Sequence, residues 1–253
     1  MLEIKELECQ AGRTQILMGI SGKIPAGEVC CIMGTNGSGK STLLNTLMGH
    51  PAYKITGGEL LYNEKDFTRL STADKAQAGF FQSFQSPPEF PEASGWDVLA
   101  MLVDCRQETK VTFPQLQALT RLYGQADLGI SDAMLARPFN EGFSGGERKR
   151  MEILQMLICQ PKVLLLDEID TGLHYTVMED MWRLVHGTAK RLNIQIFATT
   201  HSSDCWKALA AICREPSISA DATIQHVEKG VKNSKSFTGK EIVIAAERGF
   251  EVR

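Results

Sequence analysis

The order of hydrophobic and polar residues predicts a protein in which strands alternate with helices. Leu2, Ile4 and Leu7 stand at roughly alternate positions, as in a strand with one buried face. Three short apolar runs have the composition of parallel strands that are buried on both faces. They are residues 29–33, 163–166 and 194–200. Residues 40–48 have the pattern of a helix that stops at Gly49. We therefore expect an α/β fold with a mostly parallel sheet.

The alternation of strands and helices is interrupted near Gln85, where the composition of the chain changes. Residues 86–91 are rich in proline and predict a rigid loop, and residues 96–135 then have a helical pattern with little sign of strands. This predicts a helical subdomain inserted into the α/β core. Within one domain over residues 1–253, the expected boundaries are 1–85 and 160–253 for the core and about 86–159 for the subdomain.

The composition excludes several classes of protein. With 43% hydrophobic and 23% charged residues, the 253-residue chain resembles soluble globular proteins. Its net charge of -3 predicts no basic face for nucleic acid, and no apolar run approaches the ~18 residues of a membrane span. The first residues do not resemble a signal peptide. Seven cysteines without a Cys-x-x-Cys pair favour buried thiols in a reducing cytoplasm. We expect a cytoplasmic protein without a membrane span.

A glycine-rich stretch directly follows the apolar run 29–33. With the residue after it, this stretch consists of Gly34, Thr35, Asn36, Gly37, Ser38, Gly39, Lys40, Ser41 and Thr42. The spacing fits the P-loop pattern G-x-x-x-x-G-K-[ST], in which backbone N–H groups at a helix start bind phosphate oxygens. The alternative is a glycine-rich turn with an exposed lysine, but the flanking strand and helix favour a P-loop. We expect residues 34–42 to bind ATP, with Lys40 on the β- and γ-phosphates and Ser41 on Mg²⁺.

Two carboxylates follow the apolar run 163–166. Asp167 and Glu168 would stand at the carboxyl end of a buried strand, which faces the nucleotide in sheets of this class. We expect Asp167 to hold Mg²⁺ and Glu168 to polarise the attacking water. An exposed acidic turn after a core strand is the alternative, and the P-loop upstream favours the catalytic interpretation.

Gln85 and His201 are further candidates, although single residues of these types carry little information alone. Gln85 stands where the core meets the helical subdomain, so its amide could contact Mg²⁺ and the attacking water. His201 follows the run 194–200 and could hydrogen-bond the γ-phosphate and Glu168. A lone histidine after a strand is more often structural. The surrounding motifs favour a catalytic role for both residues.

Ser144, Gly145, Gly146 and Glu147 open a predicted helix. Ser144 and Glu147 have the spacing of a capping box, in which side chain and backbone of the two residues bond reciprocally. The same turn exposes the positive end of a helix. The γ-phosphate of an ATP bound to a second copy of the chain would be a suitable ligand for this helix end. Both interpretations can hold. Together with the P-loop they predict ATP sandwiched between two copies of the chain.

Taken in order, these motifs resemble those of the ATP-binding-cassette ATPases. They are residues 34–41, Gln85, residues 144–147, residues 167–168 and His201. The resemblance implies a three-layer α/β P-loop core with an inserted helical subdomain. It also implies Mg²⁺-dependent hydrolysis of ATP to ADP and phosphate, coupled to the closing of an ATP-dependent homodimer.

Within that class, residues 1 to about 170 are most similar to the SufC-type ATPases of the SUF iron–sulfur cluster assembly system. The supporting stretches are residues 32–43, 49–59, 84–89, 140–150 and 152–156. Residues 143–147 read Phe-Ser-Gly-Gly-Glu, whereas most transporter cassettes have Leu-Ser-Gly-Gly-Gln. This resemblance implies SufB- and SufD-like scaffold proteins as partners.

The similarity to SufC-type chains ends at about residue 170. Such chains usually continue with Ser/Thr-Gly-Leu-Asp, whereas here the Thr-Gly-Leu of residues 171–173 is followed by His174. Residues 174–253 are more similar to stand-alone ATPases of the AAA-15/AAA-21, or overcoming-lysogenization-defect, type. The stretches that carry this similarity are residues 197–202 and 242–253. A join within residues 165–173 would suit both kinds of chain, which indicates a natural or engineered recombinant.

Other functions stay open beside the favoured one, which is ATP hydrolysis that drives iron–sulfur cluster assembly. A transporter cassette subunit would use the same motifs but would act on a membrane protein. The C-terminal part, residues 174–253, differs from SufC-type chains. This difference suggests a stand-alone AAA-type ATPase, or a nucleotide-binding regulatory or structural module with little turnover. A repair-type ATPase that acts on nucleic acid has support from the tail alone, and the acidic net charge argues against it.

Overall fold

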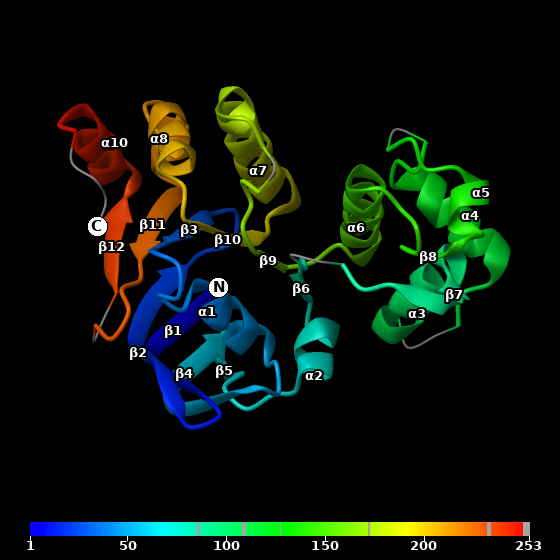
Figure 1. Cartoon of the computed structure of the whole chain (residues 1–253), viewed down its shortest axis with the longest axis horizontal. Coiled ribbons are helices and arrows are strands. Elements are labelled where there is room, and N and C mark those ends of the chain that lie inside the picture. The colour runs from blue at the N-terminus through cyan, green and yellow to red at the C-terminus, as the bar shows by residue number, and fades with distance from the viewer. Residues whose placement is uncertain (85–86, 108–109, 127, 172, 232–233, 250–253) are drawn as a thin grey trace. The chain divides into compact units, whose positions relative to one another are not determined.

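The computed structural model describes residues 1–84, 87–107, 110–126, 128–171, 173–231 and 234–249 (Figure 1). These residues form two compact units. The first consists of Met1–Gln82 and Lys162–Arg253, and the second of Ser83–Pro161. Each unit has its own hydrophobic core. In the part of the chain that the structure describes, no helix combines the length and the apolar composition that a membrane crossing needs.

A six-stranded sheet forms the centre of the first unit, in the order β12-β11-β3-β10-β9-β6. Its strands are β3 (Val29–Met33), β6 (Phe80–Gln82), β9 (Val163–Leu166), β10 (Gln195–Thr200), β11 (Ala222–His226) and β12 (Lys235–Thr238). All are parallel except β12, which pairs antiparallel with β11. Every residue of β3 and β10 is buried, which explains their continuous apolar sequences. The expected α/β fold with a mostly parallel sheet is confirmed.

An antiparallel sheet and α1 (Lys40–Met48) cover one face of the central sheet. The antiparallel strands, in the order β2-β1-β4-β5, are β1 (Leu2–Ala11), β2 (Thr14–Ile24), β4 (Tyr53–Tyr62) and β5 (Lys65–Asp66). Leu2, Ile4 and Leu7 of β1 are buried, as their spacing predicts. The three leucines of α1 join them in one hydrophobic cluster with residues of β3 and β10. The short helix α2 (Thr72–Gln77) precedes β6.

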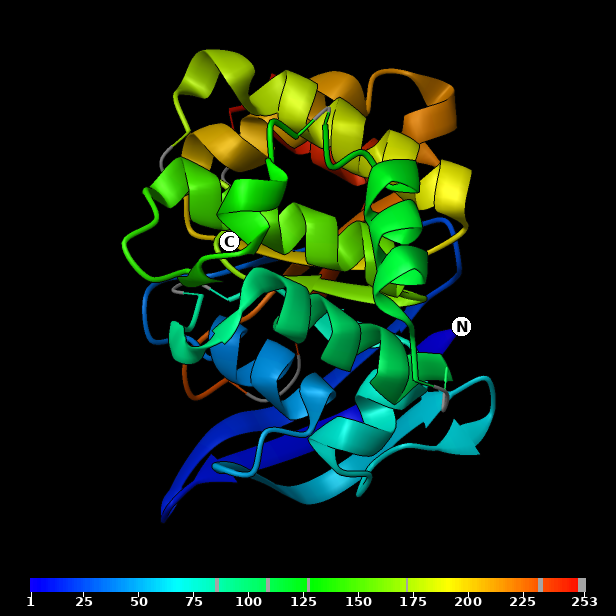
Figure 2. The same cartoon turned by 90° about the vertical axis from the view of Figure 1, so that its right-hand side faces the viewer.

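Helices cover the opposite face of the central sheet and complete a three-layer core. They are α7 (Met178–Leu192), α8 (Ser203–Ile212), α9 (Pro216–Ser219) and α10 (Gly239–Glu247), with the 3₁₀ turn η1 (Tyr175–Val177) before α7. Figures 1 and 2 both show α7, α8 and α10 on the side of the sheet away from β1, β2 and β4. Trp182 of α7 is fully buried, and its Nε1 donates a hydrogen bond to the backbone oxygen of Cys205 at 2.9 Å.

The second unit is mainly helical. Its helices are α3 (Gly95–Gln107), α4 (Phe113–Leu122), α5 (Asp132–Leu135) and α6 (Gly145–Cys159). A short antiparallel pair, β7 (Phe90–Ser94) and β8 (Pro138–Phe139), joins them. The loop expected over residues 86–91 therefore ends earlier than predicted. Phe90 begins β7 because its ring stacks on Phe139 of β8, with centroids 5.7 Å apart.

Candidate functional site

The glycine-rich loop connects β3 to α1 in the first unit. Gly34 has a φ of +154°, and a Cβ built there would lie 2.2 Å from the backbone oxygen of Val227. Gly39, the residue before α1, has a φ of +106°, and its Cβ would lie 3.0 Å from Leu17. The positive φ favours glycine at both positions, and at Gly34 the close approach of a backbone oxygen also leaves no room for a side chain. The tight turn between strand and helix that a P-loop requires is therefore present.

Lys40 stands at the first position of α1 and is only 6% exposed. Its Nζ donates hydrogen bonds to the backbone oxygens of Gly34 at 2.8 Å and Thr35 at 3.0 Å. Burial lowers the pKa of Lys40, while the charges of Glu168 and Asp167 act in the opposite direction. The ammonium group therefore lies within the loop, bonded to carbonyl oxygens that phosphate oxygens could replace as acceptors.

Ser41, the next residue of α1, connects the loop with the acidic pair after β9. Its Oγ donates a hydrogen bond to Oδ1 of Asp167 at 3.1 Å. A hydroxyl and a carboxylate are hard oxygen donors, the kind that Mg²⁺ prefers. Mg²⁺ usually takes one or two such ligands from the protein and the rest from phosphates and water. The two side chains therefore fit a Mg²⁺ ion that bridges the protein and a nucleotide.

Glu168 adopts a left-handed backbone conformation with a φ of +48°. This conformation is uncommon outside glycine and persists where neighbouring groups hold it. The backbone N–H of Glu168 donates to Oγ1 of Thr199 at 2.7 Å, and Oγ1 of Thr171 donates to Oε2 of Glu168 at 3.2 Å. Neither threonine is among the predicted site residues. One feature of the sequence could have identified Thr199: it is a polar residue near the carboxyl end of a buried apolar run.

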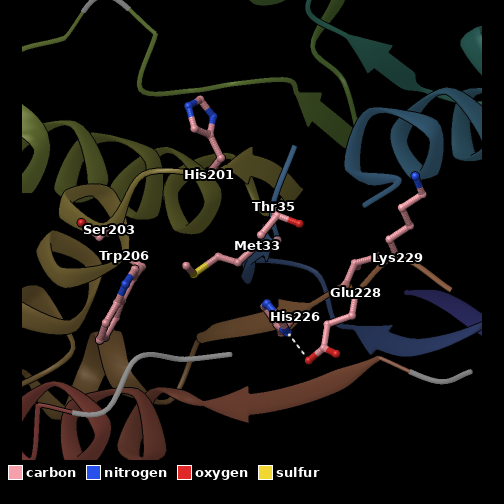
Figure 3. Close-up of a pocket in the computed structure, with 10 residues that line it drawn as sticks. Met33, Thr35, His201, Ser203, Trp206, His226, Glu228 and Lys229 are labelled. Carbon is pink, nitrogen blue, oxygen red and sulfur yellow. Dashed lines mark ion pairs between the residues drawn. The ribbon is translucent and has the colours of Figure 1, made fainter. Parts of the chain in front are cut away.

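His201 follows β10 and borders a cavity of about 660 Å³. Gly34 and Thr35 of the glycine-rich loop line the same cavity, together with Trp206 of α8 (Figure 3). His226 and Glu228 also line this cavity, with Nδ1 of His226 3.4 Å from Oε1 of Glu228. The structure therefore brings His201 to the cavity at which the loop begins, as expected for a residue at the carboxyl end of β10.

The Ser-Gly-Gly-Glu turn opens α6 in the second unit. Ser144 and Glu147 form the predicted capping box, because the backbone N–H of Ser144 donates to Oε2 of Glu147 at 2.8 Å and the N–H of Glu147 donates to Oγ of Ser144 at 3.3 Å. The backbone N–H and the hydroxyl of Ser144 both donate to the carboxylate of Glu147, and these two bonds lower the pKa of Glu147. A Cβ built on Gly145 or Gly146 would have no atom within 4 Å. No neighbouring atom of the chain would collide with a side chain at Gly145 or Gly146, so crowding within the chain does not explain why these residues are glycines.

The structure thus brings most of the predicted residues of the first unit together around the start of α1. The loop residues 34–42, Asp167, Glu168 and His201 belong to this unit, and residues 144–147 belong to the second. Gln85, which we expect beside Mg²⁺ and the attacking water, lies outside the described residues.

The sequence is similar to known ATP-dependent proteins. The profile of the ABC transporter family matches residues 17–171. The probable ATP-dependent transporter ycf16 of Pyropia yezoensis is 39% identical over 202 residues, which cover 79% of this chain and 80% of the relative. The probable ATP-dependent transporter slr0075 of Synechocystis is 44% identical over 178 residues, which cover 68% of this chain and 69% of the relative.

A solved ATP-binding cassette shares the fold. The dimeric cassette MJ0796, bound to ADP and Pi, superposes with a TM-score of 0.72 at 18% identity, over 94% of this chain and 98% of its own. At this identity the likeness concerns the fold alone. It extends well beyond residue 171, where the family profile ends. By the profile match and the identity to its relatives, the chain belongs to the ABC transporter family and is an ABC-type ATPase.

Proposed function

We propose that two copies of this chain bind ATP between them and hydrolyse it, and that hydrolysis drives iron–sulfur cluster assembly in the cytoplasm. The observation that carries the catalytic part is the hydrogen bond from Ser41 to Asp167, at 3.1 Å. It joins the phosphate-binding loop to the acidic strand in the arrangement that a nucleotide with Mg²⁺ needs. The two compact units would serve as the core and the helical subdomain of a single ABC-type domain.

Binding of ATP is assigned to residues 34–42. Backbone N–H groups of the loop and the N-terminus of α1 would bind the phosphate oxygens, and Lys40 would leave its two carbonyl acceptors for the β- and γ-phosphates. Ser41, Asp167 and Gln85 would hold Mg²⁺. When bound, Mg²⁺ neutralises charge on the phosphates and helps the leaving group depart.

Hydrolysis is assigned to Glu168 and His201. Glu168 would accept a proton from the attacking water and orient it in line with the γ-phosphate. His201 would donate a hydrogen bond to the γ-phosphate from the rim of the cavity that it shares with Gly34 and Thr35. Lys40 would stabilise the charge that develops on the transferred group.

The partner copy would complete the site with the start of its α6. Two glycines in the first turn of a helix cost conformational entropy, and neither has an atom of its own chain near its missing Cβ. Gly145 and Gly146 are therefore better explained by a group that approaches from outside the chain. The capped helix start has the positive polarity that suits a γ-phosphate. The dimeric state of the MJ0796 cassette supports this arrangement.

The role in cluster assembly rests on the resemblance to SufC-type ATPases over residues 1 to about 170. SufB- and SufD-like scaffold proteins would be the partners, and nucleic acid would not. The change of resemblance to the AAA-15/AAA-21 type within residues 165–173 is what suggests a recombinant chain. The likeness in fold covers 94% of the chain, so such a tail would keep the cassette fold but could dock partners differently.

A transporter subunit is the second candidate, because the relatives at 39% and 44% identity are named as probable ATP-dependent transporters. Purification from the source cell with and without ATP separates the two functions. Recovery of SufB- and SufD-like proteins would support cluster assembly, and recovery of a multi-span membrane protein would support transport.

Glu168→Gln tests the catalytic part. The variant keeps the size of the side chain and one acceptor oxygen but cannot accept the proton. We expect it to bind ATP as tightly as the wild type and to release no phosphate in a single-turnover assay. Wild-type phosphate release by Glu168→Gln would overturn the catalytic assignment. Absence of turnover in the wild-type protein would favour a regulatory nucleotide-binding module.

A further inference from the structure

The acidic pair begins where the ladder between β9 and β10 ends. The last paired residues of these parallel strands are Leu166 and Ala198. Beyond them Asp167 and Glu168 leave the strand, and the backbone of Glu168 turns to a φ of +48°. With no ladder to fix it, this turn needs another support if its two carboxylates are to keep their positions.

Thr199, the next residue of β10, supplies that support with both its side chain and its backbone. Its Oγ1 donates a hydrogen bond to Oδ1 of Asp167 at 2.6 Å and accepts one from the backbone N–H of Glu168 at 2.7 Å. Its backbone oxygen accepts a third bond from the N–H of Ile169 at 3.1 Å. One residue therefore fixes three consecutive residues at the end of β9.

The chemistry of this position calls for a hydroxyl. Thr199 is fully buried, and its hydroxyl acts as donor to one neighbour and as acceptor to the other. Valine has the same shape but can do neither, so it would leave the partly buried N–H of Glu168 without this acceptor. Serine can do both. The β-branched threonine is also stiff about χ1, which favours a single orientation of the hydroxyl.

We infer that Thr199 is a positioning residue for ATP hydrolysis, which orients Asp167 and Glu168 through its hydroxyl. Two hydroxyls, from Ser41 and Thr199, then hold the same oxygen of Asp167 from two different elements. The bond to the N–H of Glu168 sets the direction in which the catalytic carboxylate leaves the backbone. This inference rests on the proposed roles of Asp167 and Glu168.

The test compares Thr199→Val with Thr199→Ser in the full-length protein. We expect Thr199→Val to lower kcat by about 10–100-fold, the range typical of groups that orient metal-site ligands. The KM for ATP should stay near the wild-type value, because the glycine-rich loop is untouched. Thr199→Ser should restore most of kcat. Thr120→Val is the matched control, since Thr120 of α4 is also fully buried and its hydroxyl donates to the backbone oxygen of Gln117, within its own helix.

Wild-type kcat in Thr199→Val, or an equal loss of kcat in a folded Thr199→Ser, would overturn the inference. If Thr199→Val does not fold, Thr199→Ala and the serine variant provide the same comparison. Failure of the proposed function looks different, because the wild type would then release no phosphate or Glu168→Gln would still release it. Thermal unfolding and equilibrium ATP binding of each variant separate lost positioning from lost folding.

Discussion

The hydroxyl oxygen of Ser41 lies 3.1 Å from Oδ1 of Asp167, although the two residues are 126 positions apart in the sequence. Ser41 belongs to the helix after β3, and Asp167 follows β9. Strand β10 lies between these two strands and is parallel to both, so all three carboxyl ends meet at one edge of the sheet. The parallel topology therefore brings the glycine-rich loop and the carboxylate of Asp167 together.

Asp167→Asn should raise the Mg²⁺ concentration that gives half-maximal ATP hydrolysis by at least about tenfold, a size typical of perturbed metal sites. The amide keeps the shape of the side chain but removes the negative charge that attracts the ion. Phosphate release measured over a Mg²⁺ titration checks this. Asp66→Asn, at an exposed position in β5, is the control. An unchanged Mg²⁺ requirement in Asp167→Asn would contradict the assignment.

Gly146→Ala should stabilise the protein while it lowers hydrolysis. A Cβ at Gly146 has no atom within 4 Å, and Gly-to-Ala substitution in a compatible helix raises the free energy of unfolding by roughly 0.4–1 kcal/mol. The added methyl group would nevertheless obstruct a phosphate that approaches the start of α6. Urea unfolding and phosphate release measure the two effects.

Gly187→Ala is the matched control for this prediction. Gly187 lies within α7, is exposed and also has no atom within 4 Å of a built Cβ. We expect a similar gain in stability with unchanged hydrolysis. If Gly146→Ala hydrolyses ATP as fast as Gly187→Ala, the start of α6 does not receive a phosphate.

The local motifs could be predicted from the sequence, because each is encoded by neighbouring residues. The tight turn at Gly34, the buried run of β3 and the capping box at Ser144 all follow from short-range spacing. The role of Thr199 could not be predicted, since it depends on how β9 and β10 are paired. The start of β7 likewise depends on a ring contact between Phe90 and Phe139, which are far apart in the chain.

Lys75 of α2 should make stability rise with pH in the alkaline range. It is fully buried, and its Nζ donates to the backbone oxygen of Thr46 at 3.4 Å. Burial lowers the pKa of Lys75 from 10.5 to about 8, while Asp66 acts in the opposite direction. A base with a lower pKa in the folded state destabilises the fold below pH 8, and this cost disappears as the pH rises to 10.5.

Lys75→Met should therefore remove a rise of a few kcal/mol in the free energy of unfolding, at about 1.4 kcal/mol for each unit of pKa. Urea unfolding of wild type and variant at about pH 7 and about pH 10 gives the difference, in which the titration of other groups cancels. Lys65→Met, at an exposed position in β5, should behave as the wild type does. A rise that persists in Lys75→Met would contradict the prediction.

Thiol reactivity should distinguish Cys105 from the other cysteines. All seven lie in the described part of the chain, where Cys105 is exposed and the other six are buried. Burial also raises the pKa of Cys205 to about 12 and that of Cys213 to about 11, so few of these thiols form the reactive thiolate. In the native protein we expect one thiol per chain to react fast with a thiol reagent, and none in Cys105→Ser. Fast reaction of several thiols in the folded protein would contradict the burial of the other six cysteines.

The molar mass of Glu168→Gln with and without ATP, measured by light scattering, tests the ATP-bound dimer most directly. ATP persists in this variant because the group proposed to accept the proton of water is gone. We expect a monomer without nucleotide and twice its mass with ATP and Mg²⁺, and the added Gly146→Ala substitution should return the mass to that of the monomer. A Glu168→Gln protein that binds ATP and remains monomeric would contradict hydrolysis between two copies of the chain.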